Sequence, residues 1–156
     1  MTSVDIEISL SNYFGPRQNF IVPNVSYGLG IHEVDLLVVS QAGYCTEVEI
    51  KTSVSDLKAD LKKEHGHRSN LIKYFYFAVP EKLKDKALEL IPERAGLFVV
   101  KDINFYWHNC RIEKSPIVNK AARALKSDEL IKLGHLAAMR IWTLKERLYQ
   151  MKKESK

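Results

Sequence analysis

Two strand-like segments joined by three residues constrain this sequence more than any other feature. The first, Glu33–Ser40, is apolar on both faces beyond Asp35, and the second is Tyr44–Lys51. Gln41–Gly43 lies between them and predicts a hairpin loop, because three-residue loops commonly end in a left-handed residue and glycine adopts that conformation without strain. A strand that is apolar on both faces belongs inside a sheet. The chain is therefore expected to build its sheet around this antiparallel pair.

The register of this hairpin brings charged residues together. Centring it on Ala42 places Asp35 opposite Glu49 and Glu33 opposite Lys51. Directly opposed side chains have Cβ atoms about 5 Å apart, so two carboxylates converge with a lysine one pleat away. Like charges opposed across a sheet repel, and buried carboxylates need compensation. The pattern therefore predicts a cation at this point of the sheet.

Carboxylate oxygens are the ligands that Mg²⁺ and Mn²⁺ prefer, so Asp35 and Glu49 are the predicted metal ligands. The Lys51 ammonium can orient an attacking water or stabilise negative charge on a phosphate. Glu33 and Glu47 share the same face and are candidates for groups that support the ligands, with rim charges as the alternative. For the whole cluster, the alternative is an ordinary salt-bridged patch on a sheet surface.

The other predicted elements alternate helices and strands. At 156 residues the chain is long enough for one domain, so we expect a single domain over 1–156, with 128–151 as a C-terminal helical extension. The predicted fold class is α/β with a mixed sheet. Its remaining elements are a helix at Ser3–Phe14, a strand at Phe20–Val25, a helix from Ser53 to about Glu64, a strand at Leu71–Val79, a helix opening at Pro80–Glu81, a hairpin of Leu97–Val100 and Ile103–Ile112 turning at Lys101–Asp102, and a long helix at Asp128–Met151.

This order of elements resembles the PD-(D/E)XK nuclease superfamily, whose restriction-endonuclease-like core runs helix, three strands, helix, strand. The segments Val48–Asp60, Tyr74–Pro80 and Leu90–Val100 resemble more narrowly the MmcB-type DNA-repair nucleases. The resemblance implies that the two paired carboxylates bind a metal, that the lysine is catalytic and that an acid on the first helix completes the site. For that role Glu7 is preferred to Asp5, because Glu7 borders the apolar stripe of the helix.

A basic balance favours a polyanionic partner. The formal net charge is +5 and the pI is near 9.1, and we expect DNA to contact a basic edge. The residues predicted for that edge are Lys62, Lys63, His67, Arg68 and Lys73. The alternative for the preceding segment is a solvated helix, because Asp56 and Asp60, like Lys58 and Lys62, are spaced at i,i+4.

The last predicted helix carries Leu130, Ala137, Leu144 and Met151 on one heptad line, beside Ile141 and Leu148. Such a stripe serves either as an intramolecular packing face or as a homodimer interface. No apolar run reaches the length of a membrane span, and Cys45 and Cys110 suggest neither a disulfide framework nor a zinc site. We therefore expect a cytoplasmic protein without membrane contact.

Three functions remain open from the sequence. The leading hypothesis is a DNA endonuclease dependent on Mg²⁺ or Mn²⁺ and used in DNA repair. The second is a catalytically inactive nucleic-acid-binding module that keeps the nuclease fold, and the third is an assembly protein that acts through its last helix. Binding that survives EDTA without any cleavage would favour the module, and self-association without DNA binding would favour the third.

Overall fold

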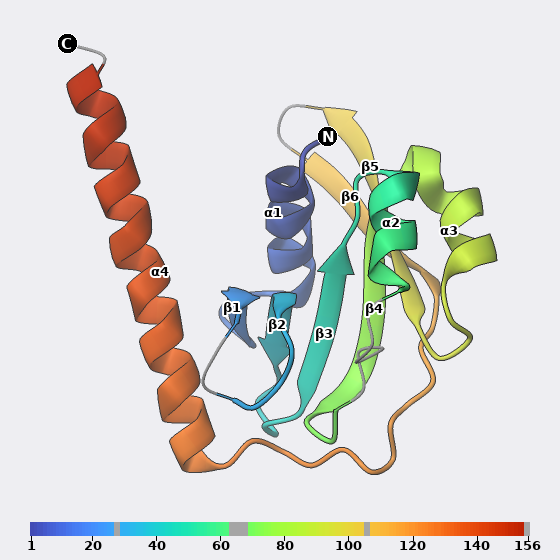
Figure 1. The fold of residues 1–156 in the computed structure, drawn as a ribbon, viewed down its shortest axis with the longest axis horizontal. Coiled ribbons are helices and arrows are strands. Elements are labelled where there is room, and N and C mark those ends of the chain that lie inside the picture. Colours follow the sequence, from blue (N-terminus) through green and yellow to red (C-terminus); the bar gives the residue numbers. More distant parts are fainter. Residues whose placement is uncertain (27–28, 63–68, 105–106, 155–156) are drawn as a thin grey trace.

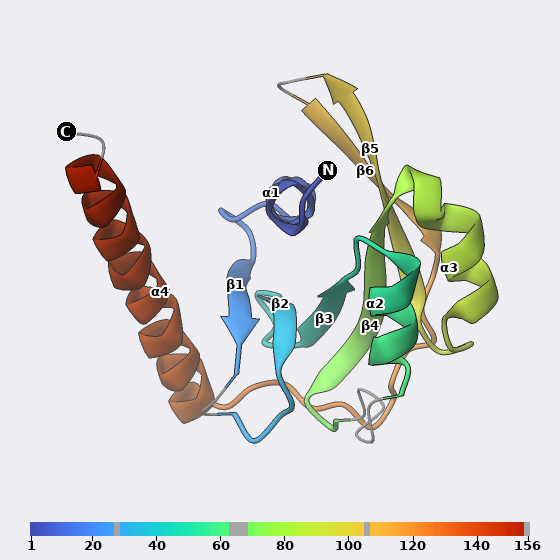
Figure 2. The same ribbon diagram turned by 45° about the horizontal axis from the view of Figure 1, so that its top comes forward.

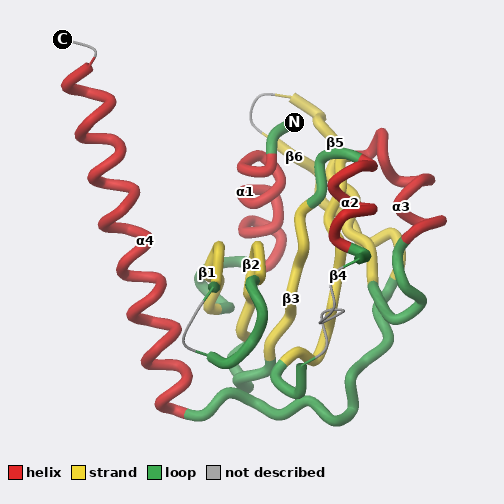
Figure 3. Tube along the Cα trace, viewed as in Figure 1, coloured by secondary structure: helices red, strands yellow, loops and turns green. Residues whose placement is uncertain are grey.

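The computed structural model describes residues 1–26, 29–62, 69–104 and 107–154. In these residues six strands form one sheet with helices packed around it (Figures 1 and 3). This arrangement confirms the predicted α/β class with a mixed sheet and a long C-terminal helix. In chain order the elements are α1 (Ser3–Phe14), β1 (Phe20–Val25), β2 (Val34–Val39), β3 (Cys45–Ile50), α2 (Val54–Asp60), β4 (Ile72–Pro80), the 3₁₀ helix η1 (Glu81–Leu83), α3 (Lys84–Leu90), β5 (Gly96–Asn104), β6 (Trp107–Lys114) and α4 (Ser127–Glu154).

The strands follow one another across the sheet in the order of the sequence, β1 to β6. The pairs β1–β2, β2–β3 and β5–β6 are antiparallel, whereas β3–β4 and β4–β5 are parallel. The parallel pairs need crossover connections, and α2 and α3 lie in those connections. Between β2 and β3, Leu36 pairs with Val48 and Val39 with Cys45, which is the register centred on Ala42.

Helices cover the two faces of the sheet separately, as Figure 2 shows. On one face α1 contributes Ile6 and Leu10, both fully buried, to a core with residues such as Phe98. On the other face Leu57 of α2 and Ala87 of α3 belong to a second core. Because neighbouring strand residues point to opposite faces, each interior strand supplies both cores.

Local sequence signals explain where the first helices begin and end. Thr2 caps α1 in a capping box with Asp5, and Gly15 ends the helix with a φ of 71°. Ser53 caps α2 by accepting a hydrogen bond from the amide of Asp56. These caps satisfy amides that have no partner inside the helix.

Three boundaries differ from the predicted ones. Lys101 and Asp102 do not form a turn, because they continue β5 and pair with Asn109 and His108 of β6. The ladder outweighs the turn tendency of a short polar pair, and residues 105–106, between β5 and β6, lie outside the described residues. α2 ends at Asp60, earlier than predicted, and the helix expected from Pro80 begins as the 3₁₀ helix η1.

The segment between β6 and α4 returns across the ends of the strands and ties them together. The amide of Asn119 donates to the carbonyl of Lys73, and the amide of Leu125 donates to the carbonyl of Gly43, at 3.0 and 2.9 Å. From there α4 extends away from the sheet beside β1 (Figure 1). In the described parts of the chain, no helix combines the length and apolarity that crossing a membrane requires.

We predict opposite effects for two glycine-to-alanine substitutions. Gly43 ends the hairpin loop with a φ of 79°, and an added Cβ would lie 3.2 Å from the Cβ of Ala124. Gly43→Ala should therefore lower the free energy of unfolding by about 1–2 kcal/mol. Gly134 lies inside α4, where an added Cβ meets nothing within 4 Å. Gly134→Ala should therefore raise the free energy of unfolding by up to about 1 kcal/mol. Urea denaturation measures both, and equal effects would contradict the strain at Gly43.

Candidate active site

The β2–β3 hairpin positions two carboxylates through reciprocal hydrogen bonds. Continuing the observed register by one residue places Asp35 opposite Glu49. The amide of Ile50 donates to Asp35 Oδ2 at 2.8 Å, and the amide of Asp35 donates to Glu49 Oε1 at 3.4 Å. Each side chain is thus held by the backbone of the opposite strand, as the predicted register requires.

Lys51 lies directly after β3, where its amide donates to the carbonyl of Ala78 in β4. Its ammonium donates to Glu49 Oε2 at 2.8 Å and to Asp35 Oδ2 at 3.4 Å. The side chains of Lys51 and Glu49 are 6% and 1% exposed, whereas that of Asp35 is 35% exposed. The group therefore opens to solvent on the side of Asp35.

Asp60 is a member of this group that the sequence interpretation missed. The solvated-helix alternative places it outside, but its side chain is buried and Oδ1 lies 3.1 Å from Lys51 Nζ. Asp56, one turn earlier, is exposed as that alternative predicts. The missed signal is the spacing, because Asp60 follows the buried Leu57 by three residues and so shares its face of the helix. We call Lys51, Asp35, Glu49 and Asp60 the Lys51 cluster.

Burial and charge shift the proton affinities inside the cluster. Burial, and then the charge of Asp35, raise the pKa of Glu49 to about 7, although Lys51 acts in the opposite direction. Burial by itself lowers the pKa of Lys51, but Glu49, Asp35 and Asp60 outweigh it and raise that pKa. The Lys51 ammonium therefore stays charged. The excess negative charge of the cluster instead raises the affinity of Glu49 for a proton.

The predicted acid on the first helix lies near the cluster. Burial, and then the charge of Asp35, raise the pKa of Glu7 above its ordinary value. Asp5, the residue set aside in the sequence interpretation, is occupied in the capping box with Thr2. Glu7 is therefore the acid of α1 that senses the charge of Asp35.

Glu47 and Glu33, the predicted supporting groups, occupy different surroundings. Glu47 is fully buried, and His32 Nε2 lies 2.8 Å from its Oε1. This pair lies beside the Lys51 cluster, since Glu47 shares the strand face of Glu49. Glu33 is exposed immediately before β2. No periodic pattern marks His32, so sequence reasoning had no signal for its contact with Glu47.

Part of the predicted basic edge falls outside the described residues, namely Lys63, His67 and Arg68. Lys62 is exposed just after α2. The ammonium of Lys73 lies 3.6 Å from the centre of the Tyr44 ring, in a cation–π contact. Of the five residues predicted for the basic edge, Lys62 and Lys73 therefore lie in the described part of the chain.

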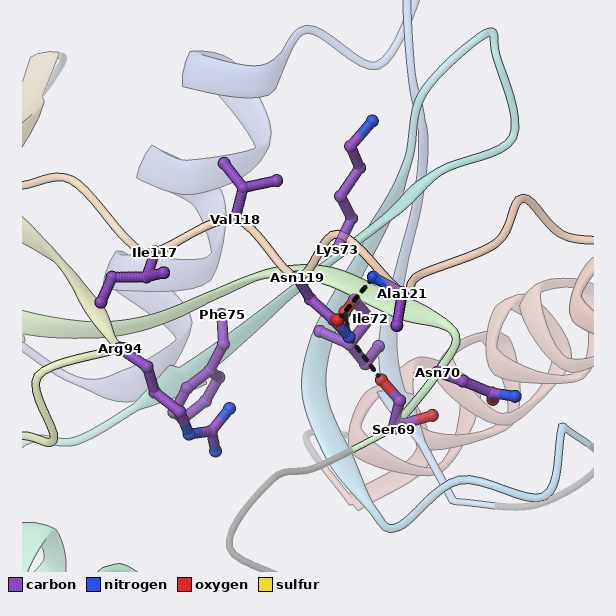
Figure 4. Close-up of a pocket in the computed structure, with 10 residues that line it drawn as sticks. All are labelled: Ser69, Asn70, Ile72, Lys73, Phe75, Arg94, Ile117, Val118, Asn119 and Ala121. Carbon is purple, nitrogen blue, oxygen red and sulfur yellow. Dashed lines mark hydrogen bonds between the residues drawn. The ribbon is translucent and has the colours of Figure 1, made fainter.

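A cavity of about 530 Å³ lies where the segment before α4 crosses β4 (Figure 4). Asn119 is part of its lining and donates from its side-chain amide nitrogen to the carbonyls of Ser69 and Ile72. Figure 4 shows the Arg94 guanidinium beside the Phe75 ring, and the two are in cation–π contact at 4.9 Å. None of the residues that line this cavity belongs to the Lys51 cluster.

The donors of the cluster suit a hard divalent ion that keeps most of its water. In the described part of the chain, no three His, Cys, Asp or Glu side chains form a ready-made metal group. Mg²⁺, however, is commonly held by one or two carboxylates together with water. Asp35 and Glu49 supply that pair, and the exposed side of Asp35 gives access from solvent. The residues present therefore fit Mg²⁺ or Mn²⁺.

Comparisons with known proteins add a family to this geometry. A family model described as "DNA repair protein MmcB-like" matches residues 11–147. Among solved structures, a protein of unknown function from Silicibacter pomeroyi matches with a TM-score of 0.66 and 19% identity, covering 91% of this chain and 90% of that one. At this identity the likeness shows the fold alone. No curated protein matches the chain.

We predict that Glu49→Gln changes how stability depends on pH in EDTA. The folded pKa of Glu49, about 7, lies above its ordinary value of 4.5, so between these values the folded parent binds more protons than the unfolded chain. The parent should lose stability relative to the variant as pH rises through this window. Urea midpoints from pH 4 to pH 8 measure the difference, with Glu33→Gln as an exposed control. A constant difference between parent and Glu49→Gln would contradict the raised pKa.

Proposed function

Because the chain belongs to the MmcB-like DNA repair protein family, we propose that it is an endonuclease that hydrolyses DNA phosphodiester bonds with Mg²⁺ or Mn²⁺. We further propose that its core is that of the PD-(D/E)XK superfamily. The order α1, β1, β2, β3, α2, β4 supports this assignment, with the acids on the second and third strands. The family points to DNA repair as the setting of the reaction.

One observation carries the proposal: two carboxylates and a lysine from adjacent strand ends converge at a point that opens to solvent. Lys51 Nζ lies within 3.4 Å of an oxygen of both Asp35 and Glu49. A fold gains little stability from such a site, because burying several charges costs more than a well-packed apolar group would. Excess negative charge that is not needed for folding supports a role in binding a cation.

Each residue receives a role from its surroundings. Asp35 and Glu49 hold the metal, assisted by a main-chain carbonyl near Ile50, and Glu7 completes the acidic rim. When bound, Mg²⁺ or Mn²⁺ supplies Lewis acidity toward the phosphate and its attacking water. Lys51 orients that water or stabilises the charge that develops on the phosphate.

Asp60 explains how Lys51 can be freed for this work. In the structure Glu49 and Asp35 hold the ammonium, but both become metal ligands in the proposed active state. Asp60 lies 3.1 Å from Lys51 Nζ and on α2, outside the hairpin. It can therefore keep the buried ammonium paired and in place when the other two carboxylates turn to the metal, so we assign it as a positioning residue.

A retained fold without catalysis is the second candidate. The small donor set of two strand carboxylates favours it, since both are already paired with Lys51 without a metal. The two functions differ in their response to EDTA, because DNA binding by an inactive module does not need the metal. Cleavage assays with single-stranded, duplex, flapped and branched DNA under Mn²⁺ and under EDTA separate them.

We predict that Lys51→Met and Glu49→Gln fail in different ways. Lys51→Met should keep the fold and the Mn²⁺ affinity but lose cleavage by about a hundredfold or more, because the ammonium acts mainly on the transition state. Glu49→Gln should lose metal affinity and cleavage together, because a neutral amide is a poorer ligand for a hard cation. Metal titration and single-turnover cleavage measure the two effects.

The matched control is Lys58→Met, which removes the same charge from an exposed position of α2 and should cut at the parental rate. Parental cleavage by Lys51→Met would overturn the assignment of the active site. Parental Mn²⁺ affinity in Asp35→Asn would overturn the assignment of the metal ligands. DNA binding without cleavage by the parent under every condition would establish the inactive module instead.

A further prediction concerns the basic edge. Replacing Lys62, Lys63 and Arg68 with alanine should weaken DNA binding and flatten its dependence on salt, because phosphate contacts release counterions. The control replaces three exposed lysines elsewhere, Lys82, Lys86 and Lys126, and so removes the same charge. DNA-binding isotherms between roughly 50 and 200 mM salt, where affinity based on phosphate contacts falls steeply, measure the affinity and the salt slope of both variants. Equal salt slopes for the two triple variants would remove the edge from the proposal.

A further inference from the structure

The outer half of α4 exposes a row of large aliphatic side chains. Ile141, Leu144 and Leu148 are 57%, 58% and 48% exposed. Met151 continues the same spacing toward the end of the helix. Exposed apolar side chains that form a contiguous row commonly mark an interaction site. We call Ile141, Leu144 and Leu148 the distal seam.

The distal seam continues a stripe that is already used inside the protein. Leu130 and Ala137, earlier on the same line of α4, pack against the core that contains the fully buried Leu133. Arg140 donates to the carbonyl of Asn24, and after it every described residue of α4 is exposed. The apolar face of α4 thus continues past the sheet, which covers only the first part of that face (Figure 1).

The spacing and the flanks of the seam define the kind of helix that would pair with it. Steps of three and four residues are those of a coiled-coil seam, in which the positions on either side choose the partner through their charges. Between 138 and 154 those flanking positions carry four cations and one acid, at Arg140, Lys145, Arg147, Lys152 and Glu154. A seam with cationic flanks is complementary to one with acidic flanks.

A second copy of the helix does not fit these flanks. In a parallel pair Arg140 would meet Lys145 of the other copy, and Arg147 would meet Lys152, so every such contact is repulsive. In an antiparallel pair Arg140 can meet Glu154, but Arg147 then faces arginine and Lys145 faces lysine. The homodimer expected as one use of this stripe stays a prediction, and the charge pattern disfavours it.

A lipid surface fits less well than a helix. The aromatic residues that could broaden the apolar face, Trp142 and Tyr149, lie beyond Lys145 and Lys152 on the helical wheel. Lys145 covers the Trp142 ring at 5.1 Å, and Lys153 covers the Tyr149 ring at 4.6 Å. The aromatic side of the helix is therefore cationic, and the continuous apolar strip is narrow, as in a helix pair.

We propose that the distal seam docks an α-helix of another protein whose apolar seam is flanked by acidic residues. Ile141 to Leu148 spans about two helical turns, so the contact is small and should be weak and reversible. The apolar seam supplies affinity, and Lys145, Arg147 and Lys152 supply the choice of partner. This surface is separate from the Lys51 cluster, so the inference does not depend on the proposed nuclease chemistry.

The test uses two synthetic helical peptides with the same leucine and isoleucine seam, one flanked by glutamate and one by lysine. Fluorescence anisotropy with the full-length protein should show binding of the acidic peptide, weakened by salt, and at least about tenfold weaker binding of the basic one. Leu144→Asp should weaken acidic-peptide binding by at least about tenfold. The control Gln150→Asp adds the same charge on the opposite side of the helix and should bind like the parent.

A charge reversal tests the choice of partner directly. The double variant Lys145→Glu with Arg147→Glu should reverse the preference and bind the basic peptide more tightly. Far-ultraviolet circular dichroism checks that the helix persists. Any one of four results would overturn the proposal. The first two are equal affinity for both peptides and loss of acidic-peptide binding in Gln150→Asp. The other two are a concentration-dependent dimer in sedimentation and binding to vesicles of anionic lipid but not to the acidic peptide.

Discussion

The buried ammonium of Lys51 is the interaction on which the arrangement of this end of the molecule depends. It is paired with Glu49 and Asp35 from the hairpin and with Asp60 from α2, so one cation joins two strands and a helix. Three carboxylates around one ammonium leave an excess of negative charge, which is relieved in part by the raised proton affinity of Glu49. Removing the lysine would leave buried carboxylates uncompensated, so Lys51→Met should keep the fold but lower its free energy of unfolding.

Strand register makes this cluster possible. A shift of one residue between β2 and β3 would move Asp35 or Glu49 to the opposite face, against the apolar core beneath α1. The backbone reinforces the correct register, because the amide of Ile50 donates to Asp35 and the amide of Asp35 donates to Glu49. The same bonds that align the side chains therefore oppose the slippage that would separate them.

The two ends of the molecule present different chemistry. The Lys51 cluster lies where β2 begins and β3 ends, and it is acidic with one partly exposed carboxylate. The segment before α4 crosses the other ends of β3 and β4 and holds Gly43 and Lys73 by backbone hydrogen bonds. It then directs α4 past β1, so the long helix leaves the sheet on the side of its edge strand.

The sequence by itself determined the elements whose signals are local. The Gln41–Gly43 loop defined the hairpin and its register, and that register placed Asp35 against Glu49, because pairing in a short hairpin is set by the turn. The heptad spacing of α4 was also visible, and the family match agrees with the resemblance noted in the segments around Glu49. Local patterns suffice here because these neighbours are close in sequence.

Contacts between distant segments were decided only by the tertiary structure. Asp60 looked like one charge of a solvated helix, and docking of α2 on the sheet turned it toward Lys51. His32 reached Glu47 through the path of a loop, and pairing with β6 extended β5 through Lys101 and Asp102. Likewise, the heptad pattern of α4 did not show which of its apolar residues the core would bury. Burial depends on which surfaces meet after the chain has folded back on itself, and a periodic pattern records only that a face is apolar or charged.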